Sequence, residues 1–277
     1  MIIADMPRFS FAILAGLILS VVLIGVVPQV HAQSALQWSP EETNRFESLP
    51  AVTVATDSTW PPMEYINRDG DLVGFDIDLL REIGLRQGFR PEFITVAWDG
   101  IFAGLLAGRY EMIASSVTLL EERTRVMRFS EPYFVAAQYL LVPGDDETTG
   151  ALTDLAGGEV GAQIGTTGSR IAGATPGVTV RAYDDLALAV EDLARGRLDG
   201  LVADSAIVEY FLGSAGAYRR EIRIAGSPYT VEEYAFAIDP DRPGLQRRIN
   251  EGLAAVRKDG TLRRFREFWF PGITGAE

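Results

Sequence analysis

The sequence predicts an α/β fold built from two similar blocks that face each other across a cleft. Short apolar strands alternate with amphipathic helices from residue 51 to residue 203, which is the pattern of α/β architectures. A break rich in acidic residues, at 143–150, separates the two blocks. Each block contains a helix, a Gly-Arg turn and a strand, and aligning the two turns places Ser116 opposite Asp204. Open α/β sheets bind ligands at the carboxyl ends of such strands.

The first 32 residues are predicted to be a secretory signal peptide rather than part of the fold. Arg8 precedes an apolar run at 11–27, and Val30-His31-Ala32 offers a small-residue cleavage site. An uncleaved membrane anchor is the alternative, because the apolar run is close to the shortest length that spans a bilayer. Residues 33–50 are polar and show no periodicity, so we expect an N-terminal extension there.

The first block is expected to begin with a strand at 51–56, which leads into a loop that contains Asp57 and Trp60. Two consecutive prolines after Trp60 exclude a helix there, so the loop is expected to be rigid. Trp98 is expected on a second loop after a strand. Periodicity and glycine stops predict a hairpin at 63–74, strands at 93–96 and 112–114, and helices at 75–87, at 101–107 and from residue 121.

The second block repeats this alternation. Strands are expected at 159–164, 178–183 and 198–203, with a helix after the loop 165–169 and another at 184–194. The tail is expected to add a strand-like stretch at 230–239 and two helices within 245–270. The aromatic residues near its end are expected to pack in the core: Phe265, Phe268, Trp269 and Phe270.

The composition excludes several classes of chemistry. The chain has no cysteine, its single histidine, His31, lies in the predicted signal peptide, and its single lysine is Lys258. A histidine base, a cysteine nucleophile, a Cys/His zinc site and a P-loop lysine are therefore absent, and we expect neither metal nor cofactor. The formal net charge of −13 also makes nucleic acids and anionic membranes poor candidate partners.

Arg123 is the first candidate for a ligand contact. It follows Glu121 and Glu122 in the first turn of a predicted helix, where a cation opposes the helix dipole unless an anion pairs with it. The planar guanidinium, with hydroxyl side chains such as Thr118 beside it, suits a carboxylate or a phosphate. The alternative is an ordinary surface ion pair between Arg123 and a neighbouring glutamate.

A second anion-binding element is the loop at 165–169, which contains Thr167 and leads into a helix. Phosphate is disfavoured as the anion because the chain lacks both phosphate-loop motifs. Arg123 for an anion, Asp204 for a cation and the aromatic rings of Trp60 and Trp98 together describe a receptor for a zwitterion. A free amino acid has this charge pattern.

These residues resemble the bacterial extracellular solute-binding proteins of family 3, the receptors that feed polar-amino-acid ABC importers. The resemblance covers nearly all of 51–270. The matching stretches are 74–79, 98–100, 118–123, 129–133, 165–167 and 196–204. The resemblance implies a two-lobed periplasmic binding protein-like fold (type II), in which two crossover segments form the hinge of a cleft. Lobe 1 would comprise 51–141 plus 231–277, and lobe 2 would comprise 142–230.

The resemblance also implies roles for single residues. Arg123 would bind the α-carboxylate of an amino acid, helped by Thr118 and by the backbone and hydroxyl of Thr167. Asp204 and Ser116 would bind the α-amino group. Four residues would surround the ligand side chain: Asp57, Trp60, Trp98 and Gln163. The chain departs from the family at Leu120, where threonine or serine is usual. Leucine cannot cap the following helix with a side-chain oxygen.

The function we expect is that of a monomeric periplasmic protein, without cofactor, that delivers a free amino acid to an ABC transporter permease in the inner membrane. Asp57 and the two tryptophans favour a polar or cationic side chain, and the sequence does not name the amino acid. One alternative is a cyclohexadienyl dehydratase-like enzyme on the same scaffold, with Glu64 or Asp99 as acid or base. Another is a ligand-sensing module for a membrane partner.

Overall fold

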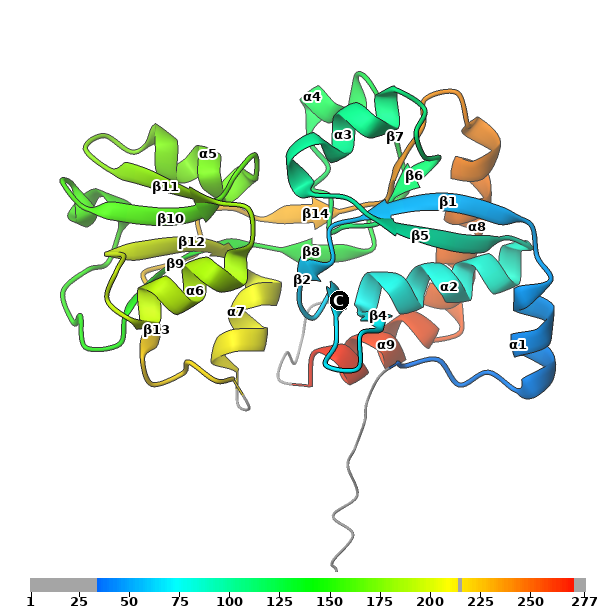
Figure 1. The fold of residues 1–277 in the computed structure, drawn as a ribbon, viewed down its shortest axis with the longest axis horizontal. Helices are drawn as coiled ribbons and strands as arrows, with labels where there is room; N and C mark the ends of the chain where they lie inside the picture. The colour runs from blue at the N-terminus through cyan, green and yellow to red at the C-terminus, as the bar shows by residue number, and fades with distance from the viewer. Residues whose placement is uncertain (1–33, 214–215, 272–277) are drawn as a thin grey trace, which may run out of the picture. The chain divides into compact units, whose positions relative to one another are not determined.

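The structure, a computed structural model, describes residues 34–213 and 216–271 and contains two five-stranded sheets (Figure 1). The first has the strand order β5-β1-β6-β15-β7 and the second β11-β10-β12-β9-β13. The first sheet consists of β1 Ala51–Thr56, β5 Arg90–Thr95, β6 Met112–Ile113, β7 Arg128–Phe129 and β15 Ala237–Ile238. The second consists of β9 Gln138–Pro143, β10 Glu159–Gln163, β11 Thr179–Tyr183, β12 Gly200–Asp204 and β13 Ile222–Ala225. The predicted α/β fold is confirmed.

Two antiparallel strands run between the sheets, β8 Phe134–Ala136 and β14 Glu232–Tyr234 (Figure 1). The chain therefore leaves the first sheet after β7, builds the second sheet, and returns through β14 to complete the first. A small separate sheet follows β1 and consists of β2 Thr59–Trp60, β3 Glu64–Ile66 and β4 Leu72–Val73. Its β3–β4 hairpin agrees with the turn predicted at 63–74.

In the first lobe, β1 is parallel to both β5 and β6, and β15 pairs antiparallel with β6. The helices are α2 Phe75–Gln87, α3 Trp98–Leu106, α4 Glu121–Thr124, α8 Pro243–Lys258 and α9 Thr261–Trp269. The predicted stop of α2 is present, because Gly88 has a left-handed φ of +72°. Trp60 differs from the prediction, since it ends β2 instead of lying on an irregular loop. Trp98 is the first residue of α3, but Asp99 and Gly100 have non-helical backbone angles, so the regular helix starts at Ile101, as predicted.

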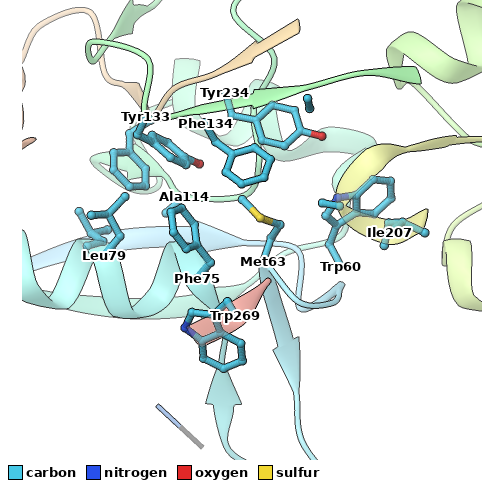
Figure 2. Close-up of a cluster of buried hydrophobic side chains, with 14 of the residues drawn as sticks. Trp60, Met63, Phe75, Leu79, Ala114, Tyr133, Phe134, Ile207, Tyr234 and Trp269 are labelled. Carbon is cyan, nitrogen blue, oxygen red and sulfur yellow. The ribbon is translucent and has the colours of Figure 1, made fainter. Parts of the chain in front are cut away.

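The core of the first lobe is rich in aromatic side chains (Figure 2). Figure 2 shows Phe75 from α2 beside Phe134 and Tyr133, and Trp60 reaching toward Ile207 of the second lobe. The aromatic tail packs here as predicted for Phe265, Trp269 and Phe270, whereas Phe268 is 37% exposed. Within the described ranges, no helix is long and apolar enough to cross a membrane.

In the second lobe, β10 is parallel to β11 and β12, and β9 and β13 close the other edge in antiparallel pairs. Its helices are η1 Leu152–Leu155, α5 Thr167–Ala174, α6 Leu186–Ala194 and α7 Ser205–Leu212. Strand β9 belongs wholly to this sheet, so the boundary expected between residues 141 and 142 falls inside a strand. We therefore propose that the second lobe comprises 138–230.

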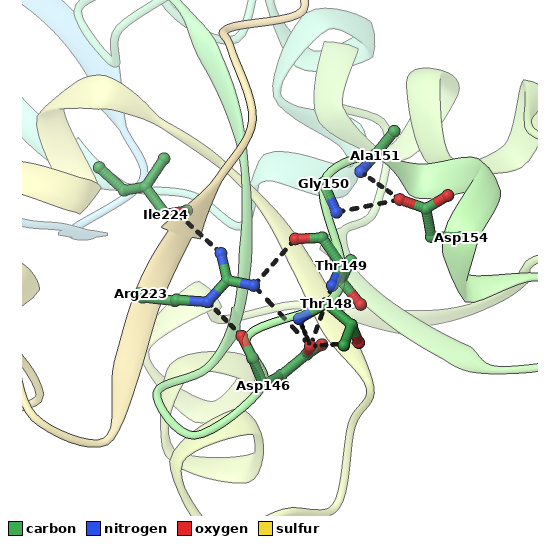
Figure 3. Close-up of polar contacts among 8 residues, drawn as sticks. All are labelled: Asp146, Thr148, Thr149, Gly150, Ala151, Asp154, Arg223 and Ile224. Atoms are coloured by element: carbon green, nitrogen blue, oxygen red, sulfur yellow. Dashed lines mark hydrogen bonds and ion pairs between the residues drawn. The ribbon is translucent and has the colours of Figure 1, made fainter.

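The acidic break at 143–150 is an ordered part of the second lobe and not a linker (Figure 3). Asp146 Oδ1 accepts the backbone N–H groups of Thr148, at 2.8 Å, and Thr149, at 3.0 Å. Arg223 on β13 donates to the carbonyl oxygens of Asp146 and Thr149. Polar residues thus fix a compact turn next to the edge strand, which is why composition alone suggested a boundary here.

The N-terminal extension predicted at 33–50, described here from residue 34, contains the helix α1 Pro40–Glu47. Ser39 and Glu42 form a capping box, a local signal that the sequence carries as Ser-Pro-Glu-Glu. The stretch before α1 is anchored on α2, since the N–H of Ala35 donates to the buried carboxylate of Asp78 and Trp38 Nε1 donates to Glu82. The predicted signal peptide, 1–32, lies outside the described residues.

Candidate ligand-binding site

A cavity lies between the two lobes, and the space inside its lining and mouth, open solvent included, is about 360 Å³. All nine residues predicted as ligand contacts line it: Asp57, Trp60, Trp98, Ser116, Thr118, Arg123, Gln163, Thr167 and Asp204. Four further lining residues were not among the predicted contacts: Glu64, Ser115, Thr166 and Tyr234. Asp99, the other carboxylate considered as an acid or base, is exposed and not part of the lining.

The carboxyl ends of parallel strands bring these residues together. Asp57 follows β1 and Ser116 follows β6 in the first lobe, whereas Gln163 ends β10 and Asp204 ends β12 in the second. Neighbouring parallel strands end at the same edge of a sheet, so side chains far apart in sequence meet there. The equivalence of Ser116 and Asp204 in the sequence thus corresponds to equivalent strand ends that face one cavity.

Arg123 is oriented by contacts within its own lobe. Its Nη1 donates to the carbonyl oxygen of Thr118 over 3.1 Å, and its guanidinium carbon lies 4.4 Å from the ring centre of Phe102 and 5.7 Å from that of Trp98. Burial, with the nearby Arg170, lowers the pKa of Arg123 to about 10, so the side chain is still charged at neutral pH. A partly buried cation beside aromatic rings is a suitable anion-binding group.

The helix-dipole argument for Arg123 is wrong in its premise. Helix α4 has only four residues, and Leu120 at its N-cap provides no side-chain hydrogen bond, so Arg123 lies in a single turn with little dipole. The alternative of a surface ion pair with neighbouring glutamates is also not realised. Glu121 pairs with Arg125 at 2.5 Å, and Glu122 pairs with Arg170 of the second lobe.

Asp204 is the best placed anion of the second lobe. Its carboxylate is 5% exposed and accepts the hydroxyl proton of Tyr234. Burial raises the pKa of Asp204 to about 7, and the charge of Glu232 adds to this effect. A positively charged group that entered the cavity would favour the ionised form.

Ser116 has a backbone φ of +49°, which is a left-handed conformation that serine rarely adopts. Two buried carboxyl groups hold it there, since its N–H donates to Asp76 Oδ2 over 2.9 Å and its hydroxyl donates to Glu64 Oε2 over 3.1 Å. Burial and the charge of Asp76 raise the pKa of Glu64 well above its usual range. The Glu64 and Asp76 pair therefore binds a proton more tightly than either carboxyl group would alone.

Asp57 and Gln163 contact each other in the cavity lining. Gln163 Nε2 donates to Asp57 Oδ2 over 3.0 Å and to the carbonyl oxygen of Asp184 over 2.9 Å. Burial raises the pKa of Asp57 from its ordinary value, although the hydroxyl of Thr59 donates to it at 3.0 Å. The indole N–H of Trp60, also in the lining, has no hydrogen-bond partner among the described residues.

Thr118 and Thr167 do not present hydroxyl protons to the cavity. Their Oγ1 atoms donate to Glu232 Oε2 over 3.0 and 2.9 Å, respectively. In this conformation the hydroxyl assistance implied by the resemblance is therefore unavailable to a ligand carboxylate, whereas the first N–H groups of α5 have no intrahelical partner. Glu232 was not predicted, because nothing in the tail around it distinguishes it from its exposed neighbour Glu233.

No group of three or more potential metal-binding side chains occurs in the ranges 34–213 and 216–271. The cavity lining offers carboxyl, hydroxyl, amide, guanidinium and indole groups. This set recognises charge and hydrogen-bonding pattern in a small polar molecule.

The chain is similar to known bacterial binding proteins. Residues 52–272 match the bacterial extracellular solute-binding proteins, family 3. The chain is 28% identical to the L-cystine-binding protein TcyJ of Escherichia coli (strain K12), with coverage of 82% of this chain and 85% of that protein. It is 29% identical to the ABC transporter arginine-binding protein 1 of the same strain, over 79% of this chain and 90% of that protein.

Solved structures show the same fold. A variant of the arginine-binding protein ArgBP from T. maritima matches with a TM-score of 0.74 and 32% identity, over 83% of this chain and 99% of that one. The arginine-, lysine-, histidine-binding protein ArtJ from Geobacillus stearothermophilus matches with a TM-score of 0.73 and 29% identity, over 80% of this chain and 95% of that one. AncCDT-1, an ancestral amino acid-binding protein and precursor of cyclohexadienyl dehydratase, matches with a TM-score of 0.74 and 29% identity, over 83% of this chain and 99% of that one. The chain therefore belongs to the bacterial extracellular solute-binding proteins, family 3.

Proposed function

We propose that the protein captures a free amino acid with a polar or cationic side chain between its two lobes and delivers it to an ABC importer. The observation that carries this proposal is the position of Arg123 on one lobe and Asp204 on the other, both facing one cavity. A group of each charge on opposite walls matches the α-carboxylate and α-ammonium of a zwitterion. Closure of the lobes would bring both contacts to the ligand at once.

The proposal includes a role for each predicted contact. Arg123 and backbone groups at Thr118 and Thr167 would bind the α-carboxylate. Asp204 would bind the α-ammonium, with the hydroxyl oxygen of Ser116 as a further acceptor. Four residues would surround the ligand side chain: Asp57, Trp60, Trp98 and Gln163.

A cationic side chain fits the remaining charge best. Once Arg123 and Asp204 are assigned to the α-groups, Asp57 is a buried carboxylate with only neutral hydrogen-bond donors. Arg123 is the only basic side chain in the described lining, so nothing there would pair with an acidic ligand side chain. A guanidinium or ammonium group would neutralise Asp57. The names of arginine-binding relatives support the same ligand class.

A thermal-shift screen of residues 33–277 against the twenty common amino acids tests the proposal. A ligand that binds only the folded state adds about 2.7 kcal/mol of stability at a hundred times its dissociation constant. We expect one or a few polar amino acids, with cationic ones foremost, to raise the unfolding temperature. If no amino acid shifts the transition, the proposal fails.

Export and partners belong to the same proposal. Residues 1–32 would direct the chain to the periplasm, where the monomeric binding protein would meet its permease. Mass spectrometry of protein recovered from a periplasmic fraction should show a chain that begins near Gln33. Recovery only as an unprocessed, membrane-bound chain would favour the anchor instead.

Glu64 supports a second candidate function. Its carboxyl group lines the cavity and its raised pKa makes it a candidate proton donor, as in a dehydratase. The likeness to AncCDT-1 shows that an amino acid-binding protein of this fold has been described as the precursor of such an enzyme. Turnover of a cyclohexadienyl substrate that is lost in Glu64→Gln would establish this activity, and absence of turnover by the unmodified protein would exclude it.

A further inference from the structure

Glu232 is a buried carboxylate at the point where the chain crosses from one lobe to the other. It begins β14, is 7% exposed, and accepts hydrogen bonds from four side chains. Three donors lie near Oε2: Thr167 Oγ1 at 2.9 Å, Thr118 Oγ1 at 3.0 Å and Gln138 Nε2 at 3.4 Å. The fourth is Thr230 Oγ1, at 3.0 Å from Oε1.

These donors come from both sides of the cleft. Thr118 follows β6 of the first lobe and faces Tyr234 in a β-bridge. Thr167 begins α5, and Gln138 begins β9, both in the second lobe. A single carboxylate thus joins two threonines that line opposite walls of the ligand cavity.

The backbone shows which lobe carries Glu232. Leu119 N–H donates to the carbonyl of Glu233 at 2.8 Å, and Ala235 N–H donates to that of Val117 at 3.0 Å, so β14 is attached to the first lobe. The stretch just before it is attached to the second lobe, because Tyr229 N–H donates to the carbonyl of Gln138 at 2.8 Å. The crossing therefore lies at residues 230–231, and the Glu232 side chain extends back over it.

We propose that Glu232 is a positioning residue for lobe closure, which holds Thr118 and Thr167 together only when the cleft is closed. The proposal rests on the proposed function for the identity of the ligand. Its structural part, that Glu232 stabilises the closed arrangement of the lobes, can be tested without a ligand. Rotation of the second lobe away from the first would remove Thr167 and Gln138 from Glu232 and leave Thr118 in place. The carboxylate would then stabilise the closed state selectively.

Selective stabilisation of the closed state has a kinetic signature. A ligand enters the open form, so bonds that exist only after closure affect the dissociation rate constant more than the association rate constant. Because Glu232 also orients the hydroxyls of Thr118 and Thr167, its loss would loosen both walls near the proposed carboxylate subsite. An ordinary stabilising contact within one lobe would change neither the dissociation rate nor the balance between open and closed forms.

The test compares Glu232→Ala and Glu232→Gln with Glu233→Ala. Glu233 is the exposed neighbour on the same strand, so its substitution changes the net charge equally without touching the cleft. Stopped-flow tryptophan fluorescence, with the amino acid found in the thermal screen, gives both rate constants. Because the chain contains no cysteine, Arg109→Cys and Ala174→Cys at exposed sites on the two lobes can carry spin labels that report the ligand-free interlobe distance.

We expect Glu232→Ala to raise the dissociation rate constant about tenfold or more, the factor for loss of one hydrogen bond to a charged group. The association rate constant should change little, and the label distances should shift toward the open form. Glu232→Gln should restore most of the slow dissociation, because the amide keeps an acceptor for the threonines. Glu233→Ala should match the unmodified protein in both measurements.

Three results would overturn the proposal. Equal dissociation rates in Glu232→Ala and the unmodified protein would show that the bonds do not control closure. Tighter binding in both Glu232 variants would show that the carboxylate merely repels the ligand anion. If Glu232→Ala is folded by circular dichroism and its interlobe label distance is unchanged, the structural part is excluded. This result does not depend on whether an amino acid binds, so it is distinct from a failure of the proposed function.

Discussion

Gln163 and Asp57 meet across the cleft, where the side-chain amide of Gln163 donates to Asp57 Oδ2 over 3.0 Å. One residue comes from each lobe, so this hydrogen bond joins the two lobes. The neutral amide of Gln163 occupies a position on Asp57 that a cationic group of a ligand could take. A guanidinium or ammonium group that entered here would replace a weak neutral donor by a charged one. We therefore propose that ligand selection near this bond depends on the charge of Asp57.

Asp57→Asn should discriminate among ligand side chains. We expect the affinity for arginine to fall by about tenfold or more, because a partly buried charge-assisted pair is lost, whereas the affinity for glutamine should fall less. Asp71→Asn, an exposed carboxylate of the same lobe, is the matched control. Isothermal titration calorimetry with both amino acids measures the difference. Equal losses for arginine and glutamine would contradict a charge-reading role.

Arg123→Ala should abolish useful affinity for any amino acid while the fold is kept. Truncating one partner of a desolvated charge pair costs about 2–5 kcal/mol, which corresponds to roughly thirtyfold or more in the dissociation constant. Arg125→Ala is the control, since Arg125 is exposed and pairs only with Glu121 among the described residues. Titration calorimetry and circular dichroism of both variants decide the matter, and unchanged affinity in Arg123→Ala would remove the proposed carboxylate contact.

Ligand affinity should rise with pH through neutrality. Burial raises the pKa of Asp204 to about 7, and a bound ammonium favours its ionised form, so binding below this pH requires release of a proton. For a ligand such as arginine we expect binding about tenfold weaker at pH 6 than at pH 8. Calorimetry in buffers of different ionisation enthalpy measures the released proton directly. Affinity that does not vary with pH would mean that Asp204 does not meet the ammonium group.

The same group affects the ligand-free protein in the opposite direction. The pKa of Asp204 is about 7 in the folded state and near its ordinary 3.8 in the unfolded state, so the folded state binds more protons between these values. Asp76, with a pKa that burial raises to about 7, contributes in the same sense. These two groups lower the free energy of unfolding as the pH rises from about 4 to 7. Asp204→Asn should reduce this slope in denaturant titrations.

Gly74→Ala should destabilise the first lobe far more than Gly70→Ala. Both glycines have positive φ angles, +142° and +89°, which L-residues adopt at a cost of about 1–2 kcal/mol. A Cβ on Gly74 would lie 2.1 Å from the carbonyl oxygen of Met63, whereas one on Gly70 would meet nothing within 4 Å. Overpacking against rigid backbone adds about 1–3 kcal/mol, so we expect a loss near 3 kcal/mol at Gly74 and about 1 kcal/mol at Gly70. Urea unfolding measures both.

Much of the fold could be predicted because its signals are local. Hydrophobic periodicity and glycine stops located most strands and helices, and the ends of β6 and β12 located Ser116 and Asp204. Helix α1 carried a readable capping box, Ser39 with Glu42, but its polar composition concealed it. The short α4 could not be foreseen from propensity, because two acidic residues suggest a longer helix than the uncapped Leu120 supports.

The remaining features depend on contacts distant in sequence. Nothing near Glu232 indicates that its carboxylate meets Thr118 and Thr167, which are 114 and 65 residues away. Similarly, β9 belongs to the second sheet because it pairs with β12, and no local sequence pattern predicts this pairing. The acidic turn at 143–150 suggested a boundary on composition, although Arg223 fixes it inside the lobe.

The strand order of the first sheet also has a consequence for the time course of synthesis. Strand β15 lies between β6 and β7, yet it is formed by residues 237 and 238, near the end of the chain. A chain that emerges from its N-terminal end therefore exposes the incomplete edge of β6 until residues 237 and 238 have been made. All strands of the second sheet, in contrast, are contained in the continuous stretch from Gln138 to Ala225, and that sheet can form before the first is closed.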